Sequence, residues 1–247
     1  MTGPGTSTYL VSGTHGPSIV IDPGPLIEEH LQAVVRRSPF AIEALLVTHG
    51  HPDHMEGAAR LRELCGAPIL AWSRDGVPVA DRLLADGEIL QLGDRNLLAI
   101  YTPGHRFDHL SFMLEQSRAV FAGDLVAGVG TVVIAPPEGN LAQYMASLQR
   151  LLDLDPRVVL PAHGPVIADP RALLLEYIAH RQERERQVLA GLASGPATVD
   201  TLVASIYADV DPQLHPMAAL SLTAHLYKLE SEGRVAHEDD IWYLTGE

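Results

Sequence analysis

The sequence predicts an α/β protein with a C-terminal module of the winged-helix kind. Three observations predict it. In residues 1–170, short apolar runs typical of strands alternate with stretches of helical spacing. Four of these runs stop directly before a loop with histidine or aspartate, and strand ends are where α/β folds carry their chemistry. After residue 180 the pattern changes to helices and a hairpin, so we expect two domains, residues 1–180 and 181–247.

The elements of the first domain follow from residue type and spacing. A strand at 44–47 is wholly apolar, as expected for a strand buried on both faces. The same reasoning predicts further strands at residues 7–11, 18–21, 68–71, 88–92, 97–101, 110–114, 119–121 and 158–160. It predicts helices at residues 26–37, 56–64 and 141–152.

The C-terminal stretch has the outline of helix, helix, helix and two-stranded wing, at residues 173–193, 198–207, 216–232, 234–236 and 241–244. Residues 186–247 hold three basic and nine acidic side chains, which repel a phosphate backbone. We therefore expect a packing lid or a subunit interface, the second of which would allow a homodimer, and we expect no duplex DNA binding. Arg181, Arg184 and Arg186 form the one basic cluster, and surface salt bridging is its simplest explanation.

Composition narrows the setting and the partners. The chain has 247 residues, 47% of them hydrophobic, and a single cysteine, which excludes an internal disulfide and fits a reducing cytosol. We find neither an apolar run of about eighteen residues nor a secretory signal in residues 1–5, so we expect a cytoplasmic protein without membrane contact. The net charge of −14 disfavours tight binding of long nucleic acid, but not of a short strand.

Metal chemistry is indicated by the run His49-Gly50-His51-Pro52-Asp53-His54. Its histidines and aspartate are ligand types of zinc-like ions, which accept imidazole nitrogen and carboxylate oxygen. A lone histidine in a loop is usually solvated, but four residues of ligand type within six positions are difficult to explain by packing. His105, Asp124 and His163 each follow another apolar strand, which gives two ligand sets and one carboxylate able to bridge them.

The order of these motifs resembles the metallo-β-lactamase superfamily over residues 6–170. The matching segments are His49-x-His51-x-Asp53-His54, Thr102-Pro103-Gly104-His105, Gly123-Asp124 and the loop with His163. The resemblance implies an αββα sandwich with the metal site at one edge. It also implies two metal ions, the first held by His49, His51 and His105, the second by Asp53, His54 and His163, with Asp124 bridging both.

The implied cofactors are two divalent ions, zinc being expected first, with manganese or iron also suited to these ligands. Two such ions share a water and lower its pKa to about 7, so that hydroxide attacks a carbonyl or phosphoryl centre. Asp53 and Asp124 are then the expected catalytic residues. Asp108 and His109 are predicted to support the ligands or to stabilise their loop, and Asp22 to orient a ligand or to cap a turn.

Within the superfamily, the segments Gly5-Thr6-Ser7-Thr8-Tyr9 and His180-Arg181-Gln182-Glu183-Arg184-Glu185 resemble the β-lactamase-like protein 2 group. That group joins the metal domain to a winged helix, and its animal member is an endoribonuclease acting on single-stranded RNA. Two departures stand out. The group normally has another strand before the first segment, and Arg106 replaces a usual threonine.

The expected function is a dinuclear metal hydrolase, with short single-stranded RNA as the first candidate substrate. A small ester, thioester or lactone, as in glyoxalase II-like enzymes, is the second. A different class is an iron persulfide dioxygenase, which draws on the same ligand motifs. A non-catalytic binding module is the third class, and failure of the protein to bind metal would favour it.

Overall fold

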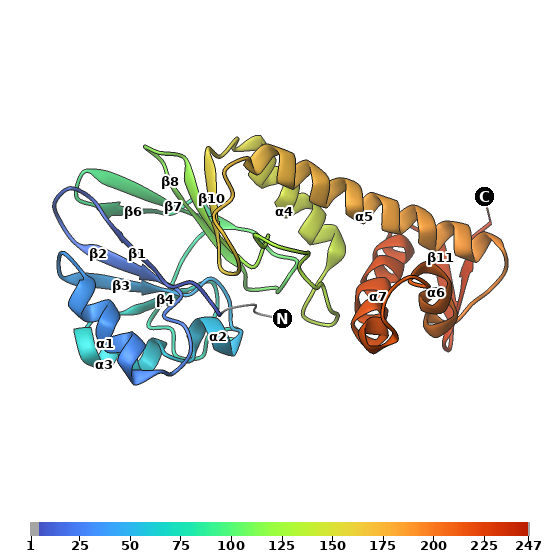
Figure 1. Cartoon of the computed structure of the whole chain (residues 1–247), viewed down its shortest axis with the longest axis horizontal. Helices are drawn as coiled ribbons and strands as arrows, with labels where there is room; N and C mark the ends of the chain where they lie inside the picture. Colours follow the sequence, from blue (N-terminus) through green and yellow to red (C-terminus); the bar gives the residue numbers. More distant parts are fainter. Residues whose placement is uncertain (1–4, 247) are drawn as a thin grey trace.

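The computed structural model describes residues 5–246, and residues 1–4 and 247 lie outside the described part. The expectation of no secretory signal rests on residues 1–5, of which only Gly5 is described. Two five-stranded sheets lie against each other with helices on their outer faces, and a smaller helical body follows at the C-terminal end (Figure 1). This is the αββα sandwich that the resemblance implies. Within residues 5–246, no helix is long and apolar enough to cross a membrane.

The first sheet has the order β1-β2-β3-β4-β5. Strands β1 and β2 form an antiparallel hairpin, and the remaining pairs are parallel. The parallel pairs need crossover connections, which helices α1 and α3 supply for β2–β3 and β3–β4. The bounds are β1 Tyr9–Ser12, β2 Ser18–Ile21, α1 Glu28–Arg37, β3 Ile42–Leu46, α2 Pro52–Met55, α3 Ala58–Cys65, β4 Ile69–Ala71 and β5 Arg82–Leu83.

The second sheet has the order β10-β9-β8-β7-β6. It is antiparallel except for β9 and β10, which run parallel because helix α4 carries the chain back between them. The bounds are β6 Ile89–Leu92, β7 Arg95–Tyr101, β8 Leu110–Leu114, β9 Ala119–Gly123, α4 Leu141–Asp153 and β10 Val158–Pro161.

Alternation along the strands divides the apolar residues among three layers. Ile19 and Ile21 point into the core between the sheets, together with Phe112, whereas Val20 between them packs under α1 and α3. Met113 likewise lies on the other side of its strand from Phe112, under α4. The period of two in the sequence therefore places the central strands between two apolar layers, and this explains why β3 contains hardly any polar residue.

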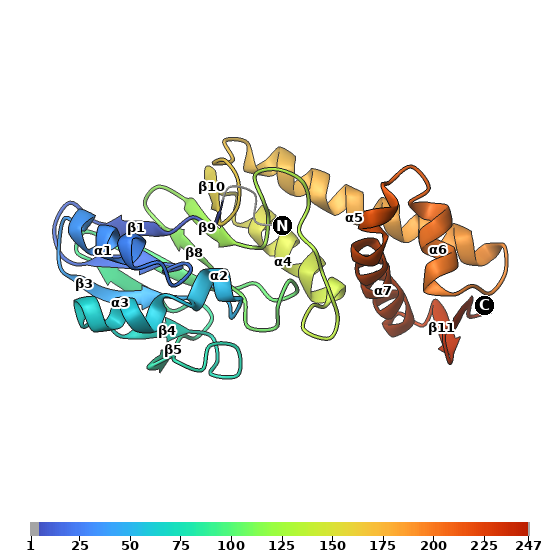
Figure 2. The same ribbon diagram turned by 60° about the horizontal axis from the view of Figure 1, so that its bottom comes forward.

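Helix α5 (Pro170–Ala193) runs from the sandwich into the C-terminal body, as Figures 1 and 2 both show. It begins three residues earlier than its apolar pattern predicts. Asp169 caps it by accepting a hydrogen bond from the amide of Ala172, and Pro170 occupies the first turn. The predicted division after residue 180 falls inside this continuous helix.

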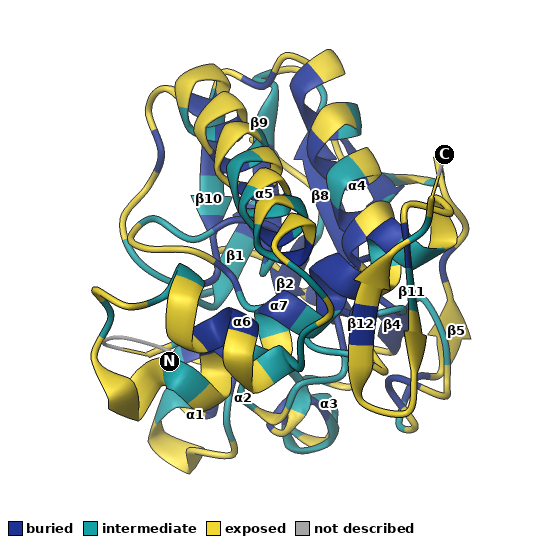
Figure 3. Ribbon diagram, turned by 90° about the vertical axis from the view of Figure 1, so that its right-hand side faces the viewer, coloured by how far each residue is buried: buried dark blue, intermediate teal, exposed yellow. Residues whose placement is uncertain are grey.

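The C-terminal body has the predicted outline of helices followed by a wing. Its elements are α6 Val199–Ile206, the 3-10 turn Pro212–Leu214, α7 His215–Ser231, β11 Val235–Glu238 and β12 Ile241–Leu244. Leu222, Leu226 and Leu229 of α7 pack against the end of α5 and against Trp242. Backbone hydrogen bonds between Ala197 and Trp242 attach the wing to the helices, and the wing strands themselves are mostly exposed (Figure 3).

The shortest elements of the fold were not predicted from the sequence. Helix α2 and strand β5 have four and two residues, too few to show a period, and the 3-10 turn before α7 has three. Only α2 bears on the site, because it carries Asp53 and His54.

Candidate metal centre

All seven predicted ligands meet at one edge of the sandwich. They come from loops that directly follow strands: the loop after β3 with α2, and the loops after β7, β9 and β10. Strand ends therefore gather residues that lie more than a hundred positions apart in the sequence. Their ligand atoms form two groups, in each of which all atoms lie within 4.8 Å of one another, namely His49, His51, His105 and Asp124, and Asp53, His54 and His163.

The first group centres on His51. Its Nδ1 lies 2.9 Å from Nε2 of His49 and 3.1 Å from Nε2 of His105. Asp124 Oδ2 closes the group, 3.5 Å from Nε2 of His105 and 4.0 Å from Nε2 of His49.

The second group centres on Asp53 Oδ2, which lies 3.5 Å from Nε2 of both His54 and His163. The other carboxylate oxygen of Asp124, Oδ1, lies 3.6 Å from His54 Nε2 and 3.3 Å from His163 Nε2. Asp124 thus turns one oxygen to each group, which is the arrangement that a bridging carboxylate requires.

Two features of this cluster fit metal ions. Nε2 of His54 is completely buried and has no hydrogen-bond partner, although such partners are normal for buried nitrogen. His51 Nδ1 faces two imidazole nitrogens at once, and one proton can satisfy only one of these contacts. A cation within each group satisfies all the lone pairs together, so the donor set fits two divalent ions.

Asp22 orients His54. It is buried, and its Oδ2 accepts hydrogen bonds from the hydroxyl of Thr48 and from Nδ1 of His54, both at 2.8 Å. Its Oδ1 accepts the amide of Thr48, so the residue also caps the turn. Both roles that we considered for Asp22 are therefore present. Burial opposes the charge of His54, but the carboxylate of Asp22 outweighs it and raises the pKa of the ring to about 9.

Asp108 holds the turn between the first two ligands. Its Oδ2 accepts the amide of Gly50 at 2.9 Å, and its Oδ1 accepts Nε of Arg106 at 2.8 Å. Arg106 also pairs with Glu138, so the residue that departs from the family pattern ties together two loops. Glycine is required at position 50, because a Cβ would overlap the carbonyl of Gly76.

His109 holds Asp124. Its Nε2 accepts the backbone amide of Asp124 at 3.0 Å, and its Nδ1 lies 2.9 Å from the hydroxyl of Thr102. Burial lowers the pKa of His109 to about 3, so the ring stays neutral and can accept this amide hydrogen. The structure therefore favours a ligand-supporting role for both Asp108 and His109.

Three supporting contacts had no signal in the sequence. The hydroxyl of Thr6 donates to Asp53 Oδ2 at 2.7 Å, the carbonyl of Gly5 lies 3.2 Å from Nδ1 of His163, and the carbonyl of Val133 lies 3.0 Å from Nδ1 of His105. Backbone carbonyls are common partners of the second nitrogen of metal-binding histidines. They orient each ring so that Nε2 points into the cluster.

The charge states of the first group, which contains His49, His51, His105 and Asp124, suit metal ligands. Burial, together with the neighbouring rings, lowers the pKa of His49 and brings that of His51 to about 4. Both rings are then neutral and keep a lone pair for a metal. Burial raises the pKa of Asp124, but the hydrogen bond from His163 and the nearby rings overcome this effect and lower it, so the residue is a carboxylate.

A cavity of about 750 Å³ opens onto the cluster. Besides five of the candidate ligands it is lined by Ala127, Val129, Thr131, Val132, Val133, Gly164, Pro165 and Met217. These additional lining residues are aliphatic or small, and among the described residues none of them is basic or aromatic. Met217 belongs to α7, so the C-terminal body forms part of the wall.

An αββα sandwich with a paired His/Asp cluster able to hold metal ions at one edge defines a protein of the metallo-β-lactamase fold. Residues 1–163 match the Metallo-beta-lactamase superfamily, and residues 198–242 match the Beta-lactamase associated winged helix domain. The chain belongs to the metallo-beta-lactamase superfamily. The predicted fold and resemblance are confirmed, including the C-terminal winged helix.

Relatives match both domains. The chain is 34% identical to the "Atrochrysone carboxyl ACP thioesterase" of Aspergillus chevalieri, over 98% of this chain and 82% of that protein. It is 31% identical to the "Beta-lactamase-like protein 2 homolog" of Drosophila melanogaster, over 95% and 85%. A crystal structure of a metallo-beta-lactamase family protein from Thermus thermophilus shares the fold, with a TM-score of 0.80 at 24% identity, over 97% and 94%.

Proposed function

We propose that this protein is a dinuclear metal hydrolase that cleaves an ester or thioester with an apolar acyl group. The single observation that carries the choice of substrate is the apolar cavity beside the cluster. Burial of an acyl chain there is favourable by roughly 0.8 kcal/mol for each methylene. A relative that carries the name of a thioesterase supports the same class.

The ligands divide as their distances suggest. His49, His51 and His105 would hold one ion, and Asp53, His54 and His163 the other, with one oxygen of Asp124 on each. Zinc is the metal that we propose first, because imidazole and carboxylate donors suit it. When bound, the two ions supply a water that ionises near neutral pH and stabilise negative charge at the attacked carbonyl.

The protein's own groups handle the proton. Oδ2 of Asp53 is engaged by Thr6 and faces the two histidines, whereas Oδ1 makes no hydrogen bond within residues 5–246 and Asp53 lines the cavity. In this proposal Asp53 Oδ1 takes the proton that the attacking water loses and returns it to the leaving thiolate or alkoxide. The hydroxyl of Thr6 keeps the carboxylate in the orientation that this transfer needs.

The cavity favours an acyl substrate over RNA. Single-stranded RNA is held by basic side chains that follow its backbone and by rings on which bases stack, and apart from the candidate ligands the described lining has neither. The acidic charge of the whole chain and of its C-terminal body works in the same direction.

The test compares substrates on metal-loaded protein. Acyl-coenzyme A thioesters of graded length are assayed by release of free thiol, beside a labelled single-stranded RNA. Asp124→Asn is expected to lose roughly a hundredfold or more in rate, because it removes a charge that both ions share. Asp209→Asn, an exposed carboxylate in the C-terminal body, is the matched control and should keep full rate.

Two results would overturn the proposed reaction, and a third would overturn the role of Asp124. Cleavage of RNA without thioester turnover would restore the ribonuclease hypothesis. Thiol-dependent oxygen uptake with iron as the bound metal would indicate a persulfide dioxygenase. Full thioester turnover in Asp124→Asn would remove the bridging role of that carboxylate.

A further inference from the structure

The winged helix contributes a side chain to the cavity of the metal centre. Met217, near the start of α7, lines that cavity opposite the sandwich residues. The other lining residues come from α2 or from the loops that follow strands β3, β7, β9 and β10. One wall of the substrate space therefore belongs to a different domain from the reacting groups.

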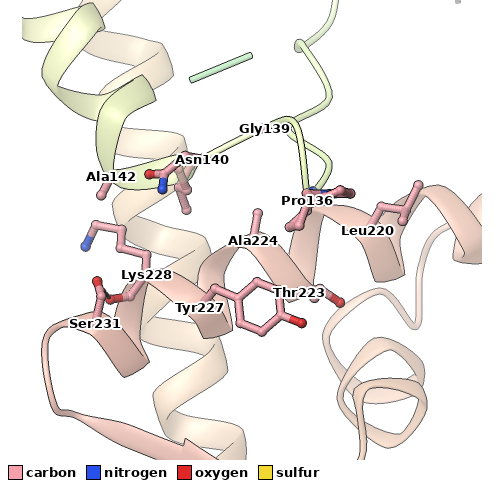
Figure 4. Close-up of a pocket in the computed structure, with 12 residues that line it drawn as sticks. Pro136, Gly139, Asn140, Ala142, Leu220, Thr223, Ala224, Tyr227, Lys228 and Ser231 are labelled. Carbon is pink, nitrogen blue, oxygen red and sulfur yellow. Dashed lines mark hydrogen bonds between the residues drawn. The ribbon is translucent and has the colours of Figure 1, made fainter. Parts of the chain in front are cut away.

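Met217 is one of three exposed apolar residues in and just before the first part of α7. Leu214, Met217 and Leu220 are spaced by three positions and have similar exposed fractions of 40%, 38% and 41%. Of these three, Met217 alone lines the cavity at the metal centre. Leu220 lines a separate crevice of about 420 Å³ between α7 and the loop that precedes α4 (Figure 4).

The position of α7 against the sandwich is set by buried contacts. Ala224 belongs to the same apolar cluster as Tyr144 and Leu148 of α4. Arg181 of α5 is buried, and one terminal nitrogen of its guanidinium donates to the carbonyl of Val132 in the cavity wall. The other terminal nitrogen lies 3.5 Å from the hydroxyl of Ser221 on α7. The distance from Met217 to the metal centre is therefore fixed by packing on both sides of the helix.

The cavity wall also carries Val129, whose side chain is 78% exposed. An aliphatic side chain so exposed at an apolar cavity offers surface that a bound apolar chain would cover. Methionine is unbranched and adapts its shape, so it forms a wall that bends to a range of chains and still limits their length.

We propose that Met217 determines which acyl groups the enzyme accepts, by closing the apolar cavity at the end supplied by the winged helix. This inference rests on the proposed acyl hydrolysis. It gives the acidic winged helix a role in substrate selection that needs no nucleic acid. Met217 is a specificity-determining residue, and it takes no part in the chemistry itself.

The experiment measures kcat/KM over thioesters from acetyl to lauroyl for wild type, Met217→Ala and Met217→Trp. The alanine variant opens the wall, so the preferred chain becomes longer, and each methylene newly buried raises kcat/KM about fourfold. The tryptophan variant fills the space and shortens the preferred chain. Leu220→Ala, on the same helix and equally exposed, should leave the profile unchanged.

A second measurement separates this inference from the proposed function. Binding of saturated fatty acids of the same lengths is followed by calorimetry in all four proteins. Turnover with the same length profile in every protein overturns the role of Met217 and leaves the hydrolase proposal intact. If there is no turnover, but the length preference in binding shifts only in the Met217 variants, acyl hydrolysis is wrong and the role of Met217 in selecting chain length is supported. If none of the variants alters the binding of the fatty acids, the proposed role of Met217 is wrong.

Discussion

Replacement of Arg181 by methionine should weaken metal binding while changing the stability of the fold only a little. Arg181 is 3% exposed, donates to the carbonyl of Val132 and lies 5.4 Å over the ring of Tyr144. The next residue, Val133, uses its carbonyl to orient His105. The guanidinium therefore acts on a candidate ligand through a short piece of backbone, and it touches neither the substrate space nor the cluster.

The stability terms largely cancel. Loss of the donor leaves a buried carbonyl unsatisfied, at about 1–3 kcal/mol, and removes a cation–ring contact that contributes roughly 2 kcal/mol when desolvated. Within residues 5–246, however, Arg181 has no carboxylate partner, and its Nε lacks any hydrogen bond. Removal of a buried, unpaired charge is favourable by several kcal/mol, and this gain offsets the two losses. We expect a net change below about 2 kcal/mol, or below about 8 °C in Tm.

The affinity for metal should change more. A loose Val133 carbonyl no longer fixes His105, and loss of such supporting contacts weakens metal binding by roughly tenfold to a hundredfold. Competition for zinc with a fluorescent chelator measures this directly. Arg181→Gln, which is neutral but keeps a donor, should recover part of the loss.

The control for this series is Arg184→Met. Arg184 lies on the same helix, with its guanidinium 4.0 Å from the ring of Tyr207, and its hydrogen bonds go to Gln187 and Ile206, away from the loop at Val132. If Arg181→Met binds zinc as tightly as this control and as wild type, the proposed path through Val133 to His105 is wrong.

Two other predictions follow from the same contacts. Asp22→Asn should weaken one zinc site by roughly tenfold to a hundredfold. Both oxygens of Asp22 accept hydrogen bonds, one of them from Nδ1 of His54, and an amide has only one oxygen and no charge. Unchanged affinity in chelator competition would mean that Asp22 serves only to cap the turn at Thr48. Deletion of residues 187–247 should leave metal per folded protein unchanged but broaden the chain-length profile, because it removes Met217 and none of the seven ligands. Loss of metal, measured by elemental analysis on the folded fraction, would show that the tail supports the ligands.

Much of the fold could be predicted from the sequence because its signals are local. The alternation in Ile19, Val20 and Ile21 marks a strand with two apolar faces, and the structure divides these residues between two cores. The run from His49 to His54 likewise needs only its own turn and α2 to bring four donors together. Such signals survive without knowledge of the rest of the chain.

The supporting contacts could not be predicted because they join distant segments. Thr6 and Asp53 are 47 positions apart, and nothing about a threonine in a β-rich stretch indicates a partner. Arg181 was expected on a helix surface within a basic cluster, and this expectation is wrong. It is buried because α7 and α4 both pack against α5, a fact of tertiary packing that helix periodicity does not contain.

The packing of α7 against the metal domain also offers a role for the acidic winged helix. A module of this outline usually suggests nucleic acid, yet a surface with three basic and nine acidic side chains repels phosphate. Two of the contacts that the module makes with the metal domain are apolar, namely Ala224 in the shared core and Met217 at the cavity. Under the proposal for Met217, the domain that its charge led us to expect as a packing lid or a subunit interface forms one side of the substrate pocket, and α5 connects it to the metal domain.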